Sequence, residues 1–127
     1  WRSTISSVGD FGIAASRLRG FPGVWVGEAK IAAVGVAVKR RVTMHGMALN
    51  VTNSLDPFAW INPCGLGRPV TSMAQALGRE VEIAEVAQTY ARRFAEVYAL
   101  RLTPVSMDEL RARLEPAAVG ARGEGVA

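Results

Sequence analysis

The chain has 127 residues and a net charge of +4, and half of its residues are apolar although only 7% are aromatic. This composition predicts one domain with a core of mainly aliphatic side chains, and it excludes a membrane span, because no apolar run approaches about 18 residues. A lone cysteine excludes an internal disulfide, which fits a reducing compartment, so we expect a cytoplasmic protein. The basic residues are not interleaved with aromatic residues, which argues against nucleic-acid binding.

The first part of the chain predicts one helix and three strands. Residues 11–18 predict a short helix that Gly20 ends, and Pro22-Gly23 predicts a turn. Strands are predicted over residues 24–26, 30–38 and 41–51, with a tight connection at residues 27–29. We expect the third strand to be antiparallel to the second, because the connection between them is too short for a parallel crossover. Since residues 30–38 are apolar on both faces, this segment is expected to be a central strand.

The second part of the chain predicts helices. An apolar stripe over residues 81–99 has helical spacing and predicts a core-facing helix, with Arg92 and Arg93 placed late to suit the helix dipole. Shorter helices are predicted over residues 55–61 after a Ser54 cap, from Thr71 or Ser72 to Gly78, and from Ser106 to Leu114, with residues 62–69 as a loop. We therefore expect an α+β fold over residues 1–115, with an antiparallel or mixed sheet packed with helices, and a disordered tail over residues 116–127.

Cys64 is the first candidate for chemistry. A lone cysteine is often only a small buried hydrophobic residue, but Cys64 lies between Pro63 and Gly65 in a polar loop. The stiff residue before it and the residue without a side chain after it would allow a substrate to approach. We interpret Cys64 as a nucleophile, which must act as the thiolate.

Lys30 is the second candidate, because it opens an otherwise apolar strand. It is either a strand-end lysine with its ammonium group in water, or a partly desolvated cation near Cys64. In the second case the ammonium group would lower the pKa of the thiol and could later shuttle a proton. The sequence alone leaves both alternatives open.

Small residues form a third feature. Ala33 and Gly35 share one face of the second predicted strand, and Gly46 and Ala48 share one face of the third. If these faces adjoin, they form either a close strand contact or a groove suited to an extended acyl chain. Burying about seven methylenes at ~0.8 kcal/mol each would give roughly 5 kcal/mol, enough to select for chain length.

His45 is the chain's one histidine, so neither a two-histidine metal site nor a zinc–cysteine cluster is expected. It is either a hydrogen-bonded structural residue or a supporting residue at the site. The basic run Lys39, Arg40 and Arg41 lies between two predicted strands. It is either a solvated connection or a landing site for an acidic protein.

Three ordered blocks resemble the lipoyl(octanoyl) transferases of the lipoate B type, in the biotin and lipoate protein ligase superfamily. The blocks are Pro22-Gly23-Val24-Trp25-Val26 followed by Lys30 to Val36, then Thr43 to Val51, then Leu55-Asp56, Phe58, Ile61, Pro63-Cys64-Gly65 and Val70-Thr71-Ser72. The resemblance begins near Arg19 and ends at about Gly78, and it implies a biotin/lipoate protein ligase-like catalytic domain.

The resemblance implies that Cys64 takes an octanoyl group from octanoyl-acyl carrier protein as a thioester, with Lys30 as the activating cation. It implies acyl-substrate contacts from Ala33, Val34, Gly35, Gly46, Met47 and Ala48, and His45 and Thr71 are candidate supporting residues. The second half-reaction would pass the octanoyl group to a lysine on a lipoyl domain of a 2-oxoacid dehydrogenase or of glycine cleavage protein H. No cofactor and no metal are implied.

The chain departs from the family pattern at its start. The family's Arg-Gly-Gly and His-Gly-Pro-Gly-Gln stretches are not in the sequence, which begins at Trp1. We therefore expect the C-terminal part of a catalytic domain whose N-terminal part is missing, with an exposed sheet edge. Two alternatives remain: an ATP-dependent lipoate or biotin ligase of the same fold, and a non-catalytic module that binds carrier proteins and in which Cys64 is inert.

Overall fold

The computed structural model describes residues 1–60 and 67–114, and it has the α+β architecture that the sequence predicts. In this part of the chain four strands form one antiparallel sheet in the order β1-β2-β3-β4. The strands are β1 (Ser16–Leu18), β2 (Phe21–Val26), β3 (Ala29–Lys39) and β4 (Val42–Leu49), and the helices are α1 (Arg2–Gly9), α2 (Asp56–Ala59), α3 (Met73–Leu77), α4 (Ile83–Tyr98) and α5 (Met107–Leu114). None of these helices is long and apolar enough to cross a membrane.

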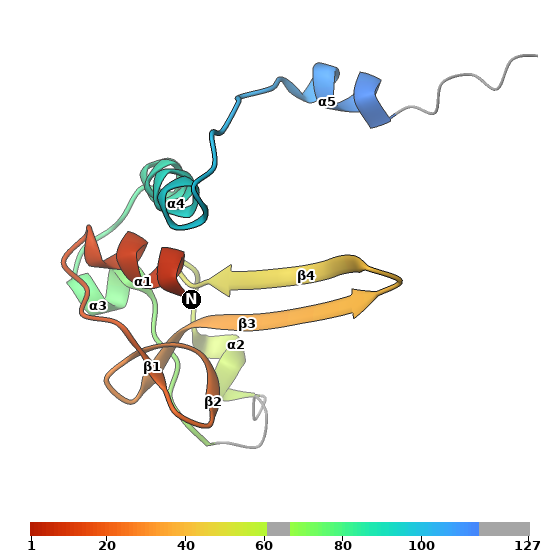
Figure 1. The fold of residues 1–127 in the computed structure, drawn as a ribbon. Helices are drawn as coiled ribbons and strands as arrows, with labels where there is room; N and C mark the ends of the chain where they lie inside the picture. The colour runs from red at the N-terminus through yellow and green to blue at the C-terminus, as the bar shows by residue number, and fades with distance from the viewer. Residues whose placement is uncertain (61–66, 115–127) are drawn as a thin grey trace, which may run out of the picture.

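The sheet has a packed end and a free end. Helices α1, α3 and α4 lie around the packed end, whereas β3 and β4 continue beyond them as a two-stranded arm (Figure 1). The core is a cluster of buried side chains at the packed end: Val8, Ile13, Val24, Ile31, Ala32, Met73, Val81 and Val86. The arm therefore extends away from the core instead of covering it.

Two predictions for the N-terminal segment are wrong. The helix lies at Arg2–Gly9 rather than over residues 11–18, and Ser16 and Leu18 instead pair with Trp25 and Phe21 of β2. The expected turn at Pro22-Gly23 is instead part of β2. The chain reverses before β2 begins, at Gly20, where φ is +82°. Glycine adopts this left-handed backbone readily, and proline is tolerated in β2 because the β1–β2 register is irregular there.

The two other hairpins agree with the prediction. Val26 pairs with Ala29 across a two-residue turn, and Lys39 pairs with Val42 across the Arg40-Arg41 turn. Both arginines have positive φ, +51° and +66°, which is the backbone of a two-residue turn that follows the sheet twist. The third predicted strand is therefore antiparallel to the second, as expected.

The caps of the two later short helices are also confirmed. The Ser72 hydroxyl accepts a hydrogen bond from the Gln75 N–H at the start of α3, and Gly78 ends this helix in the left-handed conformation. The Ser106 hydroxyl accepts from the Glu109 N–H at the start of α5. Helix α2 is shorter than predicted, and Ser54 lies just before its N-cap. Residues 67–69 of the predicted loop at 62–69 form no helix or strand, as expected, whereas residues 62–66 and the predicted tail at 116–127 lie outside the described residues.

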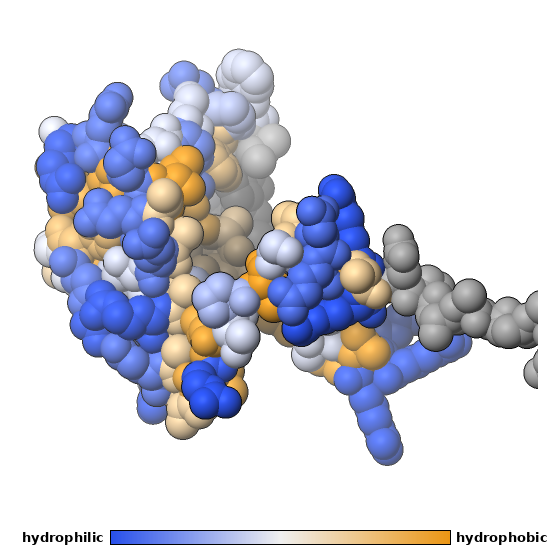
Figure 2. Space-filling view, turned by 90° about the horizontal axis from the view of Figure 1, so that it is seen from above, coloured by the Kyte–Doolittle hydropathy of each residue, from blue (hydrophilic) through white to orange (hydrophobic). Residues whose placement is uncertain are grey.

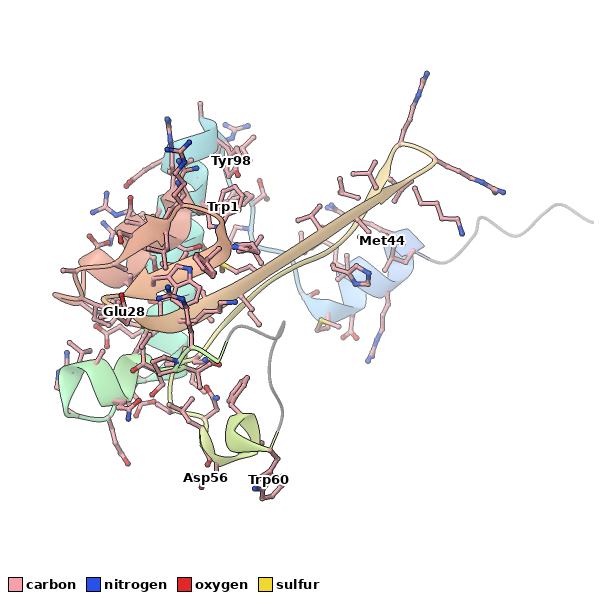
Figure 3. The ribbon with its side chains drawn as sticks, turned by 90° about the horizontal axis from the view of Figure 1, so that it is seen from below. Trp1, Glu28, Met44, Asp56, Trp60 and Tyr98 are labelled. Atoms are coloured by element: carbon pink, nitrogen blue, oxygen red, sulfur yellow. The ribbon has the colours of Figure 1, made fainter. Side chains whose placement is uncertain are left out.

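Burial along β3 differs from the prediction of a strand covered on both faces. Ile31 and Ala32 are fully buried, but Val36 and Val38 are 61% and 68% exposed. Figure 3 shows Met44 of the facing strand far out on the same arm, away from Trp1 and Tyr98. Only the first part of β3 therefore behaves as a central strand in the described structure.

Helix α4 is also less buried than its apolar stripe predicts. Val86 lies in the core, whereas Ile83 near its start is 63% exposed and Tyr98 at its end is exposed too. Apolar surface of the segment that follows, including Leu100 and Leu102, also remains uncovered. Orange patches persist among the blue polar surface in the view from above (Figure 2).

Arg92 and Arg93 were predicted to interact favourably with the helix dipole at the C-terminal end of α4, but both lie before its last turn. Both guanidinium groups instead reach Asp10 at the end of α1, and the Arg93 Nε donates to Asp10 Oδ2 at 2.8 Å. The hydrogen bonds from Arg93, reinforced by the positive charges of both arginines, hold the pKa of the Asp10 carboxyl below its usual value. This ion-pair cluster joins α1 to α4 at the surface.

Candidate functional site

Lys30 lies where three segments of the chain meet. Its residue partner across the β2–β3 hairpin is Trp25. On its other side, the Lys30 N–H donates to the Pro69 carbonyl at 2.9 Å, and the Thr71 N–H donates to the Lys30 carbonyl, also at 2.9 Å. These bonds form a parallel bridge between Lys30 and Val70, so the backbone of Lys30 is held from both sides.

Cys64 lies outside the described residues, so its predicted contact with Lys30 stays a prediction. The structure does bring residues 69–71, which follow Cys64 closely in sequence, against Lys30. The first of them, Pro69, is five residues after Cys64 in the sequence.

The Lys30 side chain lies against an aromatic ring, a feature that the sequence analysis missed. The Lys30 Nζ lies over the Trp25 ring, 4.9 Å from its centroid. The Arg68 guanidinium lies 4.4 Å from the centroid of the Phe21 ring, and it pairs with Glu28 at 2.9 Å. A signal was available, because a two-residue turn at Gly27-Glu28 necessarily places residue 25 opposite residue 30.

The small residues of β3 and β4 are paired as the groove hypothesis requires. Ala33 pairs with Ala48, and Gly35 pairs with Gly46. A solvent-open hollow of about 560 Å³ follows this stretch of the hairpin. Its lining consists of Ala33, Val34, Gly35, His45, Gly46, Met47 and Ala48. All six residues predicted to contact the acyl chain are therefore brought together.

The glycine of β3 leaves real space beside the hollow. Among the described residues, a Cβ atom built on Gly35 would meet no other atom within 4 Å. Close strand packing therefore does not explain the absence of a side chain at this position.

The hollow combines residues from both faces of the hairpin. Side chains alternate between the two faces of a strand, so Lys30 and Val34 lie on one face of β3, and Ala33 and Gly35 lie on the other. Met47 of β4 pairs with Val34 and therefore lies on the same face as Lys30. Helix α1 contacts Met47, because the hydroxyl of the fully buried Thr4 lies 2.7 Å from the Met47 sulfur. Val34 and Met47 thus connect the hollow with the strand face that carries Lys30.

The two candidate supporting residues differ in their surroundings. His45 is exposed at the rim of the hollow and has a left-handed backbone with φ of +67°, which is uncommon for a residue other than glycine. Thr71 is buried, and its hydroxyl lies 3.0 Å from the Gln75 side-chain oxygen. Asn50, directly after β4, donates its side-chain N–H to the Thr71 carbonyl at 3.1 Å. Thr71 and Asn50 therefore hold the segment that pairs with Lys30.

The basic run Lys39, Arg40 and Arg41 forms the tip of the arm, and all three residues are exposed. This placement agrees with a solvated strand connection, and it leaves the alternative of an acidic partner untested. Among the described residues, no group of three His, Cys, Asp or Glu side chains could hold a metal ion.

Comparison with known proteins places these features in a family. Residues 2–95 match the family model of the lipoyl protein ligase A/B catalytic domain. The chain is 48% identical over 103 residues to an octanoyltransferase from Solibacter usitatus, covering 81% of this chain and 46% of that protein. It is 50% identical over 91 residues to an octanoyltransferase from Geobacter metallireducens, covering 71% of this chain and 43% of that protein. The chain thus spans somewhat less than half the length of these curated relatives.

Solved structures share the fold. Protein Ta0514 from T. acidophilum, described as a candidate lipoate protein ligase, superimposes with a TM-score of 0.63 at 20% identity, covering 87% of this chain and 48% of that one. Lipoate-protein ligase A bound with ATP superimposes with a TM-score of 0.56 at 20% identity, covering 87% of this chain and 49% of that one. The fold and the family match over residues 2–95 agree, and the chain belongs to the lipoyl protein ligase A/B catalytic domain family.

Proposed function

We propose that this domain moves an octanoyl group from octanoyl-acyl carrier protein to a lysine of a lipoyl domain, through a thioester on Cys64. The similarity to curated octanoyltransferases at about half identity carries the proposal. The acceptors we propose are lipoyl domains of 2-oxoacid dehydrogenases and of glycine cleavage protein H. The backbone anchoring of Lys30 and the hollow on the β3–β4 hairpin support the proposed transfer.

The first half-reaction would load the enzyme. The Cys64 thiolate attacks the carbonyl carbon of the octanoyl thioester, a new carbon–sulfur bond forms, and the carrier's thiolate leaves and takes up a proton. The ammonium group of Lys30 stabilises the attacking thiolate and can supply that proton. One thioester is exchanged for another, so this step is nearly balanced in free energy.

The second half-reaction would deliver the acyl group. The amine of the acceptor lysine attacks the thioester carbonyl, an amide forms, and the Cys64 thiolate is regenerated as the leaving group. The amine loses a proton, which Lys30 can accept if it gave one up in the first step. Conversion of a thioester into an amide is downhill, so the transfer needs no ATP.

The hollow between Ala33–Gly35 and Gly46–Ala48 would hold the octanoyl tail. Its lining consists mainly of small or apolar residues, which contact a methylene chain without a specific polar group. At ~0.8 kcal/mol for each buried methylene, a tail of about seven methylenes gains roughly 5 kcal/mol. Each methylene that fails to fit loses its share, so the hollow would select for length.

Intact-mass measurement tests the nucleophile. The chain is incubated with octanoyl-acyl carrier protein, and the expected result is one octanoyl group that hydroxylamine removes, as it does from a thioester. Because Cys64 is the chain's one cysteine, such an adduct identifies its position. Cys64→Ser is the control and should remain unmodified. An unmodified wild-type chain would favour the non-catalytic module, and modification that requires ATP and free octanoate would favour a ligase.

Lysine substitution tests the ion pair. The chain contains two lysines, Lys30 at the junction and Lys39 at the exposed tip of the arm. Lys30→Met should shift the pH profile of Cys64 alkylation by iodoacetamide upward by about 1 unit or more, since an opposite charge nearby lowers a pKa by that amount. Lys39→Met removes the same charge elsewhere and should leave the profile unchanged. Equal profiles for both variants would remove Lys30 from the mechanism.

A further inference from the structure

We propose that Trp25 is a positioning residue for Lys30: its indole face holds the ammonium group where the reaction needs it. The inference rests on the proposed function, because it concerns the residue that activates Cys64. Lysine is a long, flexible side chain that loses much rotamer freedom when it is fixed. A site that uses a lysine cation therefore needs something that restricts it, and the structure shows two restraints on the Lys30 side chain.

The first restraint is the ring itself. The Lys30 Nζ lies 4.9 Å from the centroid of the Trp25 ring, within the range of a cation–π contact. Trp25 is only 1% exposed, and its Nε1–H donates to the Phe21 carbonyl at 3.3 Å. The Phe21 ring also packs edge-on against it, with centroids 6.1 Å apart at 75°. The plane of the indole is thus set by β2, independently of the lysine that lies over it.

The second restraint is Gly23, which leaves a path for the aliphatic stem of Lys30. A Cβ atom at Gly23 would lie 3.3 Å from the Lys30 Cε and 3.4 Å from its Cδ. It would also lie only 2.6 Å from the Ala32 carbonyl oxygen, and the φ of +126° disfavours any other residue. The stem therefore runs along bare backbone of β2, and this path directs the ammonium group over the indole.

The third feature concerns the neighbouring cation, Arg68. Its guanidinium lies 4.4 Å from the Phe21 centroid and 5.9 Å from the Trp25 centroid, so both cations share one aromatic pair. Glu28 pairs with Arg68 at 2.9 Å and offsets its charge. Arg68 is thereby kept on Phe21, which leaves the Trp25 face to Lys30.

Magnetic resonance tests the contact directly on the wild-type chain. The ring current of Trp25 should shift the Hε signals of Lys30 upfield, while those of the exposed Lys39 stay near random-coil values and serve as an internal reference. Trp25→Leu should return the Lys30 signals to the Lys39 position. Trp25→Phe should keep part of the shift. Wild-type Lys30 signals that already coincide with those of Lys39 would overturn the proposal without any variant.

The pH profile of Cys64 alkylation tests the consequence. Trp25→Leu should move the profile upward by about 0.5 unit, toward that of Lys30→Met, whereas Trp25→Phe should stay close to wild type. Val24→Ala is the control, because Val24 is a fully buried neighbour in β2 whose truncation destabilises the fold without touching the ammonium group. A Trp25→Leu profile equal to wild type, or a Val24→Ala profile shifted as much as Trp25→Leu, would overturn the positioning role.

These results are separable from the fate of the proposed function. If Lys30→Met shifts the profile and an octanoyl adduct forms, but Trp25→Leu leaves the profile unshifted, the function stands and the positioning role fails. If no octanoyl adduct forms on Cys64 while the Lys30 signals keep their ring-current shift, the Trp25 contact stands and the octanoyl transfer fails.

Discussion

The two ends of strand β3 have similar sequences and opposite environments. Ile31 at the packed end is fully buried between β2, β4 and the helices, whereas Val38 near the tip is 68% exposed. Both residues are β-branched, and both belong to the same apolar run over residues 31–38. The difference shows that apolar periodicity reports the capacity of a strand to be covered, and the rest of the molecule decides where covering occurs.

The largest expected effect comes from truncating the packed end. Ile31→Ala removes a fully buried side chain and should lower the free energy of unfolding by about 2–5 kcal/mol, through lost burial and a cavity. Val38→Ala, in the same strand, should change it by less than about 0.5 kcal/mol, because the side chain is already in water. Urea unfolding of both variants measures the contrast. Equal losses would mean that the arm is covered in solution.

A glycine pair sharpens the same comparison. Gly23→Ala places a Cβ 2.6 Å from the Ala32 carbonyl oxygen on a strained backbone, and we expect a loss of about 1–3 kcal/mol. Gly35→Ala adds the same methyl group where no described atom lies within 4 Å, and folding should be nearly unaffected. Thermal unfolding of the two variants checks this. A large loss for Gly35→Ala would show that the hollow is closed when the protein is in solution.

The surface ion pairs of the packed end should contribute a small, pH-dependent effect. The folded-state pKa of Asp10 is lowered, so its contribution to stability is present above the unfolded value of about 3.9 and is lost as pH falls through the folded pKa. Asp10→Asn should therefore be less stable than wild type at pH 7, and this difference should shrink in acid. Asp108→Asn is the control, because its ion pair on α5 is almost fully exposed and long, at 3.7 Å. A difference that grows in acid would contradict the assignment.

The smallest effect on stability is expected at the tip of the arm. Replacing both Arg40 and Arg41 with glutamine leaves the packed end unchanged, so the melting temperature should stay nearly constant. If the tip meets an acidic partner, the rate of octanoyl capture from its carrier should fall at low salt and become equal to wild type at high salt. A rate that is unchanged at every salt concentration would assign the tip to solvent alone.

The local parts of the fold could be predicted from sequence, because their signals are local. The Gly27-Glu28 and Arg40-Arg41 turns follow from two adjacent strand patterns, and the Ser72 and Gly78 caps follow from residue type at helix ends. The pairing of the small residues followed from the same register. Helix α1 was missed, because its serine-rich sequence has only Ile5 and Val8 as large apolar side chains and the helix packs against the distant α4.

The parts that were missed at the site depend on contacts across the chain. The parallel bridge to Val70 has no signature near Lys30, and the sequence gives no measure of how much of an apolar strand its neighbours cover. The Trp25 contact is the exception, because it follows from a predicted hairpin register and was overlooked.

The bridge between Lys30 and Val70 has a consequence for the order of folding. The three hairpins of the sheet join neighbours in sequence, but this bridge closes a loop of about 40 residues, which costs more chain entropy than any two-residue turn. The sheet can therefore form before the junction does, and gentle denaturation should release the junction first. Reactivity at the lysine would then be lost while most β-structure persists, which makes activity a more sensitive gauge of integrity than circular dichroism.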